Sequence, residues 1–195
     1  MRKFPRWFSF MTAHRLLATK PEVHQVPASP ENYGSRRAAG VDTIVLHTME
    51  GGAAGTARWL ADPDAGVSYH YGIGRDGRIY QYVDESYAAW HAGNGAWNRH
   101  SVGISMEGRS GDPEMFTDPM YEGLFSLCRY LTSKYAIKPT RSTIIGHFEV
   151  PHPTRRGRFG GLNGHTDPGP HFPWWERLLA DLSNPPFEAI GGSNV

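Results

Sequence analysis

The sequence has a single cysteine, no long hydrophobic run and almost no net charge. Cys128 therefore cannot form an internal disulfide, and the apolar helical pattern around it predicts a small buried side chain rather than a reactive thiol. No apolar run approaches the ~20 residues of a membrane-spanning helix, so we expect no membrane insertion. The net charge of +1 gives no reason to expect nucleic acid as a partner.

The N-terminal residues show only part of a signal peptide. Arg2 and Lys3 provide the basic start. His14 and Arg15 then interrupt the apolar stretch that should follow, and no small-residue cleavage site stands out. We therefore expect no signal peptide, and a protein that acts inside a cell or leaves it by another route.

The 195 residues fit one domain with less regular ends, which we expect to be a monomer. Residues 1–40 carry several prolines and scattered basic residues, which predicts an irregular basic N-terminal arm. Residues 41–182 contain the patterns of a folded domain. Residues 183–195 are rich in Pro, Gly, Ser and Asn, which predicts a flexible tail or linker stump.

Strand and helix patterns alternate within residues 41–182. Short β-rich runs predict strands at 43–47, 68–73, 78–83, 101–106 and 143–146. An Asp-Gly pair joins the second and third as a hairpin signal. Helices are predicted at 53–61 and 174–182, and Thr117 can cap a third whose apolar positions recur up to Tyr135. The chain is therefore predicted to be a single α/β domain, with a mixed, twisted central sheet and helices packed on its faces.

Two histidines, His47 and His147, end predicted strands. Side chains at strand ends project into the loops, where functional sites are usually built. Asp167 lies in a later loop. Two imidazoles and one carboxylate suit a catalytic zinc site, because three protein ligands leave the fourth position open for water. With ten histidines in the chain, however, any one of them is more often a surface or core residue than a ligand.

Seven short motifs occur along the chain. They are VLHT at 45–48, SYHYGI at 68–73, RDGRI at 75–79, WHAG at 90–93, NRHSVGI at 98–104, GH at 146–147 and TDPG at 166–169. In this order they resemble the type 2 N-acetylmuramoyl-L-alanine amidases, a group that includes phage lysozyme-type amidases and peptidoglycan recognition proteins. The resemblance spans roughly residues 41–182 and implies the fold of that group.

The resemblance also implies a reaction and a metal. Residues 41–182 would form a zinc amidase catalytic domain in which His47, His147 and Asp167 hold Zn²⁺. The partner would be bacterial peptidoglycan, cut at the amide between N-acetylmuramic acid and the L-alanine of the stem peptide. The tetrahedral intermediate of such a reaction needs a donor for its oxyanion and a proton for the departing amine.

Two further residues match positions near the metal in relatives. Tyr69 matches the tyrosine of phage-type members, and a phenol can donate to an oxyanion without ionising. Its alternative role is a core aromatic, since Tyr69 and Tyr71 lie on one strand face. His165 stands where many relatives carry lysine, and it supplies a positive charge only when protonated. The alternative for His165 is an exposed loop histidine.

Ser105 departs from one branch of the family. Relatives that act on soluble anhydro-muropeptides place a glutamate there, and the nearest acid in this chain is Glu107. We therefore expect a phage or prophage endolysin, held in the host cytoplasm until its release to the cell wall, rather than an intracellular recycling amidase. A recognition protein that binds peptidoglycan without cutting it is the third possibility, which the presence of all three ligands disfavours.

The groove around the metal is expected to include Thr48, Trp90 and His91 as substrate-binding residues. A core position is the alternative for Trp90. Glu149 could orient the second ring nitrogen of a ligand histidine, as metal-bound histidines usually require. It could equally be a solvated loop charge.

A basic run separates the last two ligands. Arg155, Arg156 and Arg158 could form a flap whose guanidinium groups bind the carboxylates of the stem peptide in bidentate fashion. A solvated charge run is the simpler interpretation.

Overall fold

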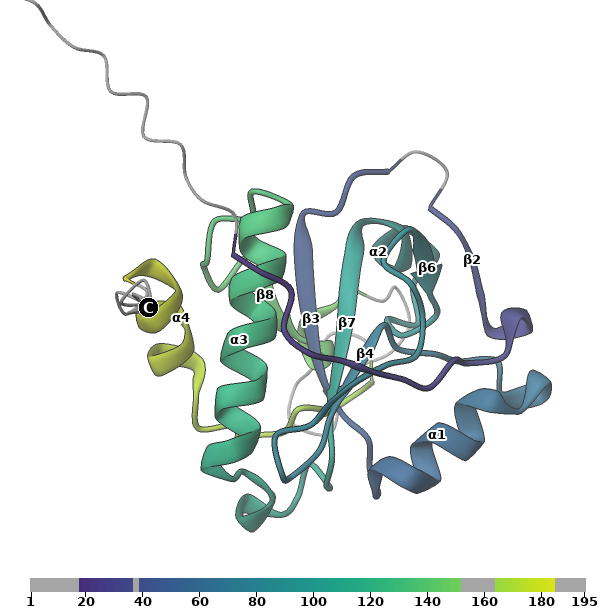
Figure 1. Ribbon diagram of the computed structural model, residues 1–195, viewed down its shortest axis with the longest axis horizontal. Coiled ribbons are helices and arrows are strands. Elements are labelled where there is room, and N and C mark those ends of the chain that lie inside the picture. The colour runs from purple at the N-terminus through teal and green to yellow at the C-terminus, as the bar shows by residue number, and fades with distance from the viewer. Residues whose placement is uncertain (1–17, 37–38, 152–163, 185–195) are drawn as a thin grey trace, which may run out of the picture.

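The computed structural model describes residues 18–36, 39–151 and 164–184, which form a six-stranded central sheet with helices around it (Figure 1). The strands are β1 His24–Gln25, β3 Thr43–Thr48, β4 Tyr71–Ile73, β5 Ile79–Gln81, β7 Ser101–Met106 and β8 Ile144–Gly146. Across the sheet their order is β1-β5-β4-β7-β3-β8. Neighbours among β4, β7, β3 and β8 are parallel, whereas β5 is antiparallel to β4. The predicted mixed sheet and α/β class are confirmed.

Helices and a second small sheet complete the described fold. The α-helices are α1 Ala53–Ala61, α2 Gly95–His100, α3 Asp118–Lys134 and α4 Trp175–Ser183. Short 3-10 helices span Pro30–Asn32, Pro63–Ala65, Pro113–Met115 and His147–Glu149. The second sheet pairs β2 Tyr33–Ser35 with β6 Tyr87–Ala89 in antiparallel fashion. Within the described ranges, none of the helices has the length and apolar character needed to cross a membrane.

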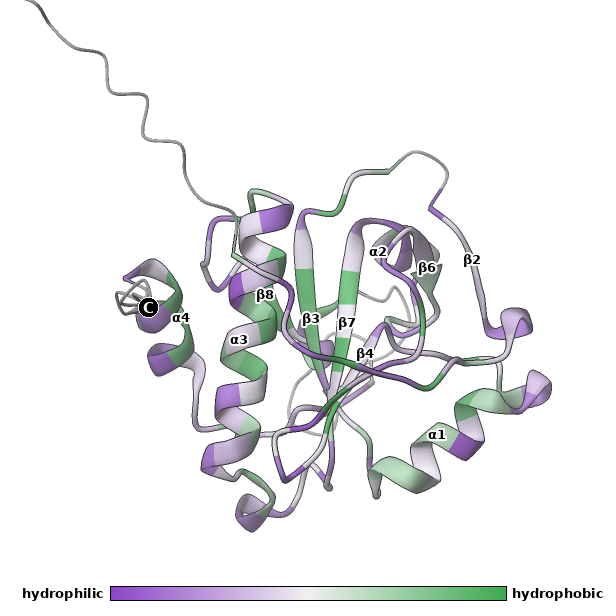
Figure 2. Ribbon diagram, in the orientation of Figure 1, coloured by the Kyte–Doolittle hydropathy of each residue, from purple (hydrophilic) through white to green (hydrophobic). Residues whose placement is uncertain are grey.

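Helix α3 has the capping and the apolar stripe that its sequence predicts. The hydroxyl of Thr117 accepts a hydrogen bond from the backbone N–H of Met120 at 3.3 Å, which satisfies one of the open donors at the helix start. The buried side chains of the stripe are Tyr121, Leu124, Cys128 and Leu131. Burial raises the pKa of the Cys128 thiol, which disfavours the reactive thiolate. Figure 2 shows hydrophobic and hydrophilic patches along α3, as expected for a helix with one buried face.

Strand β7 has one face of large residues and one of small residues. The large residues, which pack into the main core with α3 and α4, are Val102, Ile104 and Met106. The residues between them are Ser101, Gly103 and Ser105. Because successive side chains of a strand point to opposite faces, these small residues leave room on the face away from α3.

Strand β3 divides its side chains in the same way. Ile44 and Leu46 belong to the main core, whereas Val45 belongs to a separate small cluster. By this alternation His47 lies on the same face as Val45. In the parallel register His47 is paired with Ser105 of β7. The first predicted ligand therefore lies beside the small residues of β7.

The described part of the N-terminal arm, residues 18–36, is more regular than its composition predicts. Strand β1 adds to the edge of the main sheet beside β5, and β2 pairs with β6. The buried guanidinium of Arg36 donates to the backbone carbonyls of Glu85 at 2.7 Å and Ser101 at 3.0 Å. Strands of two or three residues are too short to show alternation in the sequence, so the pattern gave no sign of them.

Candidate active site

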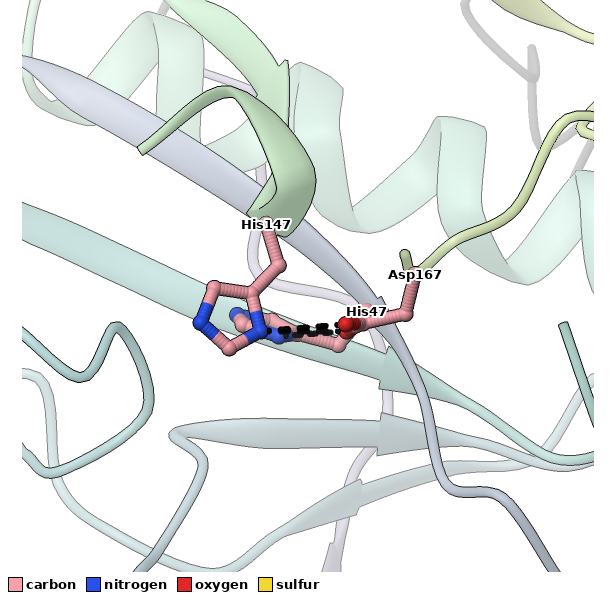
Figure 3. Close-up of side chains that lie close together, drawn as sticks. All are labelled: His47, His147 and Asp167. Carbon is pink, nitrogen blue, oxygen red and sulfur yellow. Dashed lines mark hydrogen bonds and ion pairs between the residues drawn. The ribbon is translucent and has the colours of Figure 1, made fainter. Parts of the chain in front are cut away.

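The three predicted metal ligands meet at one end of the central sheet. Figure 3 shows His47, His147 and Asp167 with their polar atoms pointing toward one another. Nδ1 of His47 lies 3.0 Å from Oδ2 of Asp167, and Nδ1 of His147 lies 3.1 Å from Oδ1 of the same carboxylate. One ligand atom from each residue lies within 4.8 Å of the other two.

This donor set fits a tetrahedral metal ion. Ligand atoms bound to zinc at about 2.0–2.1 Å with tetrahedral angles lie about 3.4 Å apart. The two measured nitrogen–oxygen separations, 3.0 and 3.1 Å, are close to this value. Two nitrogens and one oxygen also leave a fourth position for water or substrate, as catalytic zinc sites require. The His-His-Asp triad is therefore consistent with a metal site.

The sheet topology explains why histidines 100 positions apart meet. Strands β3 and β8 are parallel neighbours, with Leu46 paired with Gly146. The residue that follows each member of this pair is one of the two histidines, so both lie at the same edge of the sheet. His147 also begins a short 3-10 helix, which turns the chain out of the strand.

A hydrogen bond and a glycine hold Asp167 beside the histidines. The backbone N–H of Phe148 donates to the carbonyl of Asp167 at 3.1 Å, which joins the loop to the turn that carries His147. Gly169 has a φ of 91°, and a Cβ there would lie 2.3 Å from the carbonyl oxygen of Ser110. Only glycine fits this close approach, which explains the glycine of the TDPG motif.

The environment favours the protonation states that metal binding needs. Burial lowers the pKa of His47 to about 4, so its ring is neutral at neutral pH. Burial alone would raise the pKa of Asp167, but its hydrogen bonds with His147 and His47 outweigh that effect and hold the pKa well below its usual range. A neutral imidazole beside an ionised carboxylate can accept a divalent cation.

The triad opens into a cavity of about 580 Å³. Its lining includes the predicted site residues Thr48, Tyr69, Trp90, His91 and His165, together with His147 and Asp167 of the triad. The volume lies within the range of roughly 300–1,000 Å³ that is usual for small-molecule sites. The structure therefore brings seven of the predicted site residues to one cavity.

Tyr69 and His165 lie beside the two histidines of the triad. The ring centroids of Tyr69 and His47 are 5.1 Å apart. His165 stacks on His147 with 3.8 Å between ring centroids. Burial raises the pKa of Tyr69, and the charge of Asp167 adds to this effect, so the phenol stays protonated and can donate a hydrogen bond. Both side chains line the cavity beside the triad.

The three predicted substrate-binding residues of the groove differ in what they expose. Trp90 is 39% exposed, so its indole offers surface to a ligand. Thr48 is buried, and its hydroxyl donates to Oε1 of Glu50 at 2.6 Å. His91 is also buried, and its two ring nitrogens lie 3.1 Å from His47 and 3.1 Å from Ser101. Substrate contact stays a prediction for all three.

Glu149 has contacts of a different kind from those predicted. Its carboxylate accepts a hydrogen bond from the backbone N–H of Gly146 at 2.8 Å and forms an ion pair with Arg141. These described contacts of Glu149 therefore stabilise the turn that carries His147, and neither of them is with a histidine ring. The predicted substrate-binding arginines, Arg155, Arg156 and Arg158, lie outside the described residues.

Two residues that line the cavity, Trp59 and Glu50, were not predicted from the sequence. Trp59, on helix α1, lines the cavity and is 48% exposed. Glu50 also lines it and has a φ of 52°, which is uncommon for a residue with a side chain. A tryptophan in a short helix just after the strand that carries His47 is a signal that could have identified Trp59. No feature of the sequence predicts the backbone conformation of Glu50.

Comparison with known proteins agrees with this geometry. Residues 36–170 match the N-acetylmuramoyl-L-alanine amidase family. The chain is 33% identical over 156 residues to N-acetylmuramoyl-L-alanine amidase A of Achromobacter lyticus, a match that covers 76% of this chain and 86% of that protein. It is 36% identical over 122 residues to 1,6-anhydro-N-acetylmuramyl-L-alanine amidase AmpD of Haemophilus influenzae, over 60% of this chain and 59% of that protein.

The fold has a close counterpart among solved structures. A crystal structure of AmpD matches with a TM-score of 0.63 and 29% sequence identity, over 85% of this chain and 97% of that chain. Sequence motifs, fold and the geometry of the triad thus lead to the same assignment. The chain belongs to the N-acetylmuramoyl-L-alanine amidase family.

Proposed function

We propose that this amidase depends on zinc and hydrolyses the bond between the lactyl group of N-acetylmuramic acid and the L-alanine of the peptidoglycan stem peptide. The observation that carries the proposal is the meeting of His47, His147 and Asp167, of which His147 and Asp167 line one cavity. Zinc bound there would polarise the scissile carbonyl and lower the pKa of a water molecule to about 7.

The side chains around the triad supply the remaining chemistry. Tyr69 is the donor to the oxygen that becomes negative in the tetrahedral intermediate, because its phenol stays protonated and lies beside His47. His165, stacked on His147, passes a proton to the departing amine when its ring is charged. Trp90 and Trp59 offer apolar surface at the cavity to the sugar or peptide.

We further propose that the natural substrate is the polymeric wall, and that the protein is a phage or prophage endolysin kept in the host cytoplasm until its release. Tyr69 beside the triad supports this proposal, as does the small Ser105 on β7 at the position where recycling relatives carry glutamate. The similarity to AmpD favours the alternative, hydrolysis of soluble anhydro-muropeptides.

Parallel digestion of the two substrates separates these proposals. Insoluble sacculi and soluble anhydro-muropeptides, at equal concentrations of stem peptide, are incubated with the enzyme, and released peptides are quantified. We expect faster release from sacculi, because Ser105 stands where relatives that act on soluble anhydro-muropeptides carry glutamate. Release from the soluble fragments alone would instead favour the recycling role, while leaving the amidase assignment unchanged.

A further inference from the structure

His91 lies directly behind the ligand His47. Its ring is 5% exposed, and Nδ1 lies 3.1 Å from Nε2 of His47, the ring nitrogen that does not face Asp167. The other nitrogen of His91, Nε2, lies 3.1 Å from the hydroxyl oxygen of Ser101. The His47 ring is thus linked through His91 to strand β7.

The hydrogen bond that the Ser101 hydroxyl donates fixes the direction of the other two hydrogen bonds. The Ser101 hydroxyl donates to the backbone carbonyl of Trp97 at 2.6 Å. A hydroxyl has one proton, so the Ser101 oxygen is left to accept from Nε2–H of His91. In a neutral imidazole only one nitrogen carries a proton, so Nδ1 of His91 accepts from Nε2–H of His47. Nδ1 of His47, which contacts Asp167 in this structure, would then carry no proton when a metal ion is bound and could serve as its ligand.

Two neighbouring residues fix the position of His91. A Cβ on Gly103 would lie 2.4 Å from Cγ of the His91 ring, so the ring can pack on β7 only because this residue is glycine. The side-chain oxygen of Asn98 accepts from the backbone N–H groups of His91 at 3.2 Å and Ala92 at 2.8 Å. Residues of the motifs at 90–93 and 98–104 thus build one arrangement.

We propose that His91 is a positioning residue that fixes the tautomer and the ring orientation of His47, so that Nδ1 of His47 is presented to the metal. This inference rests on the proposed zinc site. A ligand histidine usually donates its second N–H to a carboxylate or a carbonyl. Here the acceptor is a second histidine, whose own tautomer is set by Ser101 and the carbonyl of Trp97.

Zinc affinity of the purified protein, measured by competition with a chelator, tests this role. His91→Ala removes the acceptor for His47, and we expect zinc binding about 10–100-fold weaker than in the wild type, the usual cost of removing such a partner. His91→Asn should retain most of the affinity, because its side-chain oxygen can occupy the place of Nδ1. His24→Ala is the matched control, since His24 is exposed on β1, and it should bind zinc like the wild type.

Nitrogen-15 NMR of the zinc-loaded wild type provides a second readout. We expect protonated Nε2 atoms on both His47 and His91, and wild-type thermal unfolding of the zinc-free His91→Asn variant. Wild-type zinc affinity in His91→Ala, equal losses in the Ala and Asn variants, or a proton on Nδ1 of His91 would each overturn the inference. A wild type that binds no zinc would overturn the proposed function itself, so the two failures are distinguishable.

Discussion

Replacing Asp167 with asparagine is expected to abolish zinc binding and to lower kcat/KM by at least about a thousandfold, since metal activation supplies several kcal/mol and each 1.36 kcal/mol is tenfold in rate. Asparagine has nearly the same shape, so the change removes the negative charge and one of the carboxylate oxygens with little effect on packing. Both oxygens of Asp167 face histidines in the wild type. An amide cannot replace them, because its nitrogen is not a ligand and its oxygen carries no full charge.

The measurement combines the zinc content of the purified variant with its rate on a muropeptide substrate. Asp42→Asn is the matched control, because Asp42 makes the same kind of contact, with His100 at 2.8 Å, but its side chain is 71% exposed. We expect wild-type zinc content and rate in that control. Near-normal activity of Asp167→Asn with a full complement of zinc would contradict the ligand assignment.

Replacing Tyr69 with phenylalanine is expected to lower kcat by about 100–1000-fold, the usual cost of losing one donor to an oxyanion. The ring still packs beside His47, so zinc affinity and KM should change little. Since the donor acts only when charge develops on the substrate oxygen, the loss should fall on kcat rather than on KM.

Steady-state kinetics with a zinc titration tests this second prediction. Tyr87→Phe is the matched control, because the ring of Tyr87 is 47% exposed and is not among the residues that line the cavity. Wild-type kcat in Tyr69→Phe would show that the phenol is a packing residue. An equal loss in zinc affinity would show that it acts through the metal site instead.

Local patterns in the sequence were sufficient for much of the fold. The strand 101–106 and the helix 53–61 have the predicted boundaries. The predicted positions of His47 and His147 at strand ends also led to the triad, because parallel neighbouring strands end at the same edge of a sheet. The roles of Tyr69 and His165 came from resemblance alone, since a tyrosine on a strand is more simply a core residue.

Features that depend on long-range contacts could not be predicted. Contact of His91 with substrate stays a prediction, but the sequence did not indicate that its ring nitrogens face His47 and Ser101. That arrangement requires glycine at position 103, because a side chain there would overlap the His91 ring. No local sequence pattern shows which ring packs against this glycine. The short strands β1 and β2 are held by pairing partners 56 and 54 positions away, at Gln81 and Ala88, rather than by propensity.

The central claim, a zinc-dependent amidase, is tested most directly by mass spectrometry of purified peptidoglycan after digestion, with and without a zinc chelator. We predict free stem peptides that begin at L-alanine, lost on chelation and restored by added zinc. New reducing sugar ends, or binding to the wall with no release of peptide, would contradict the account.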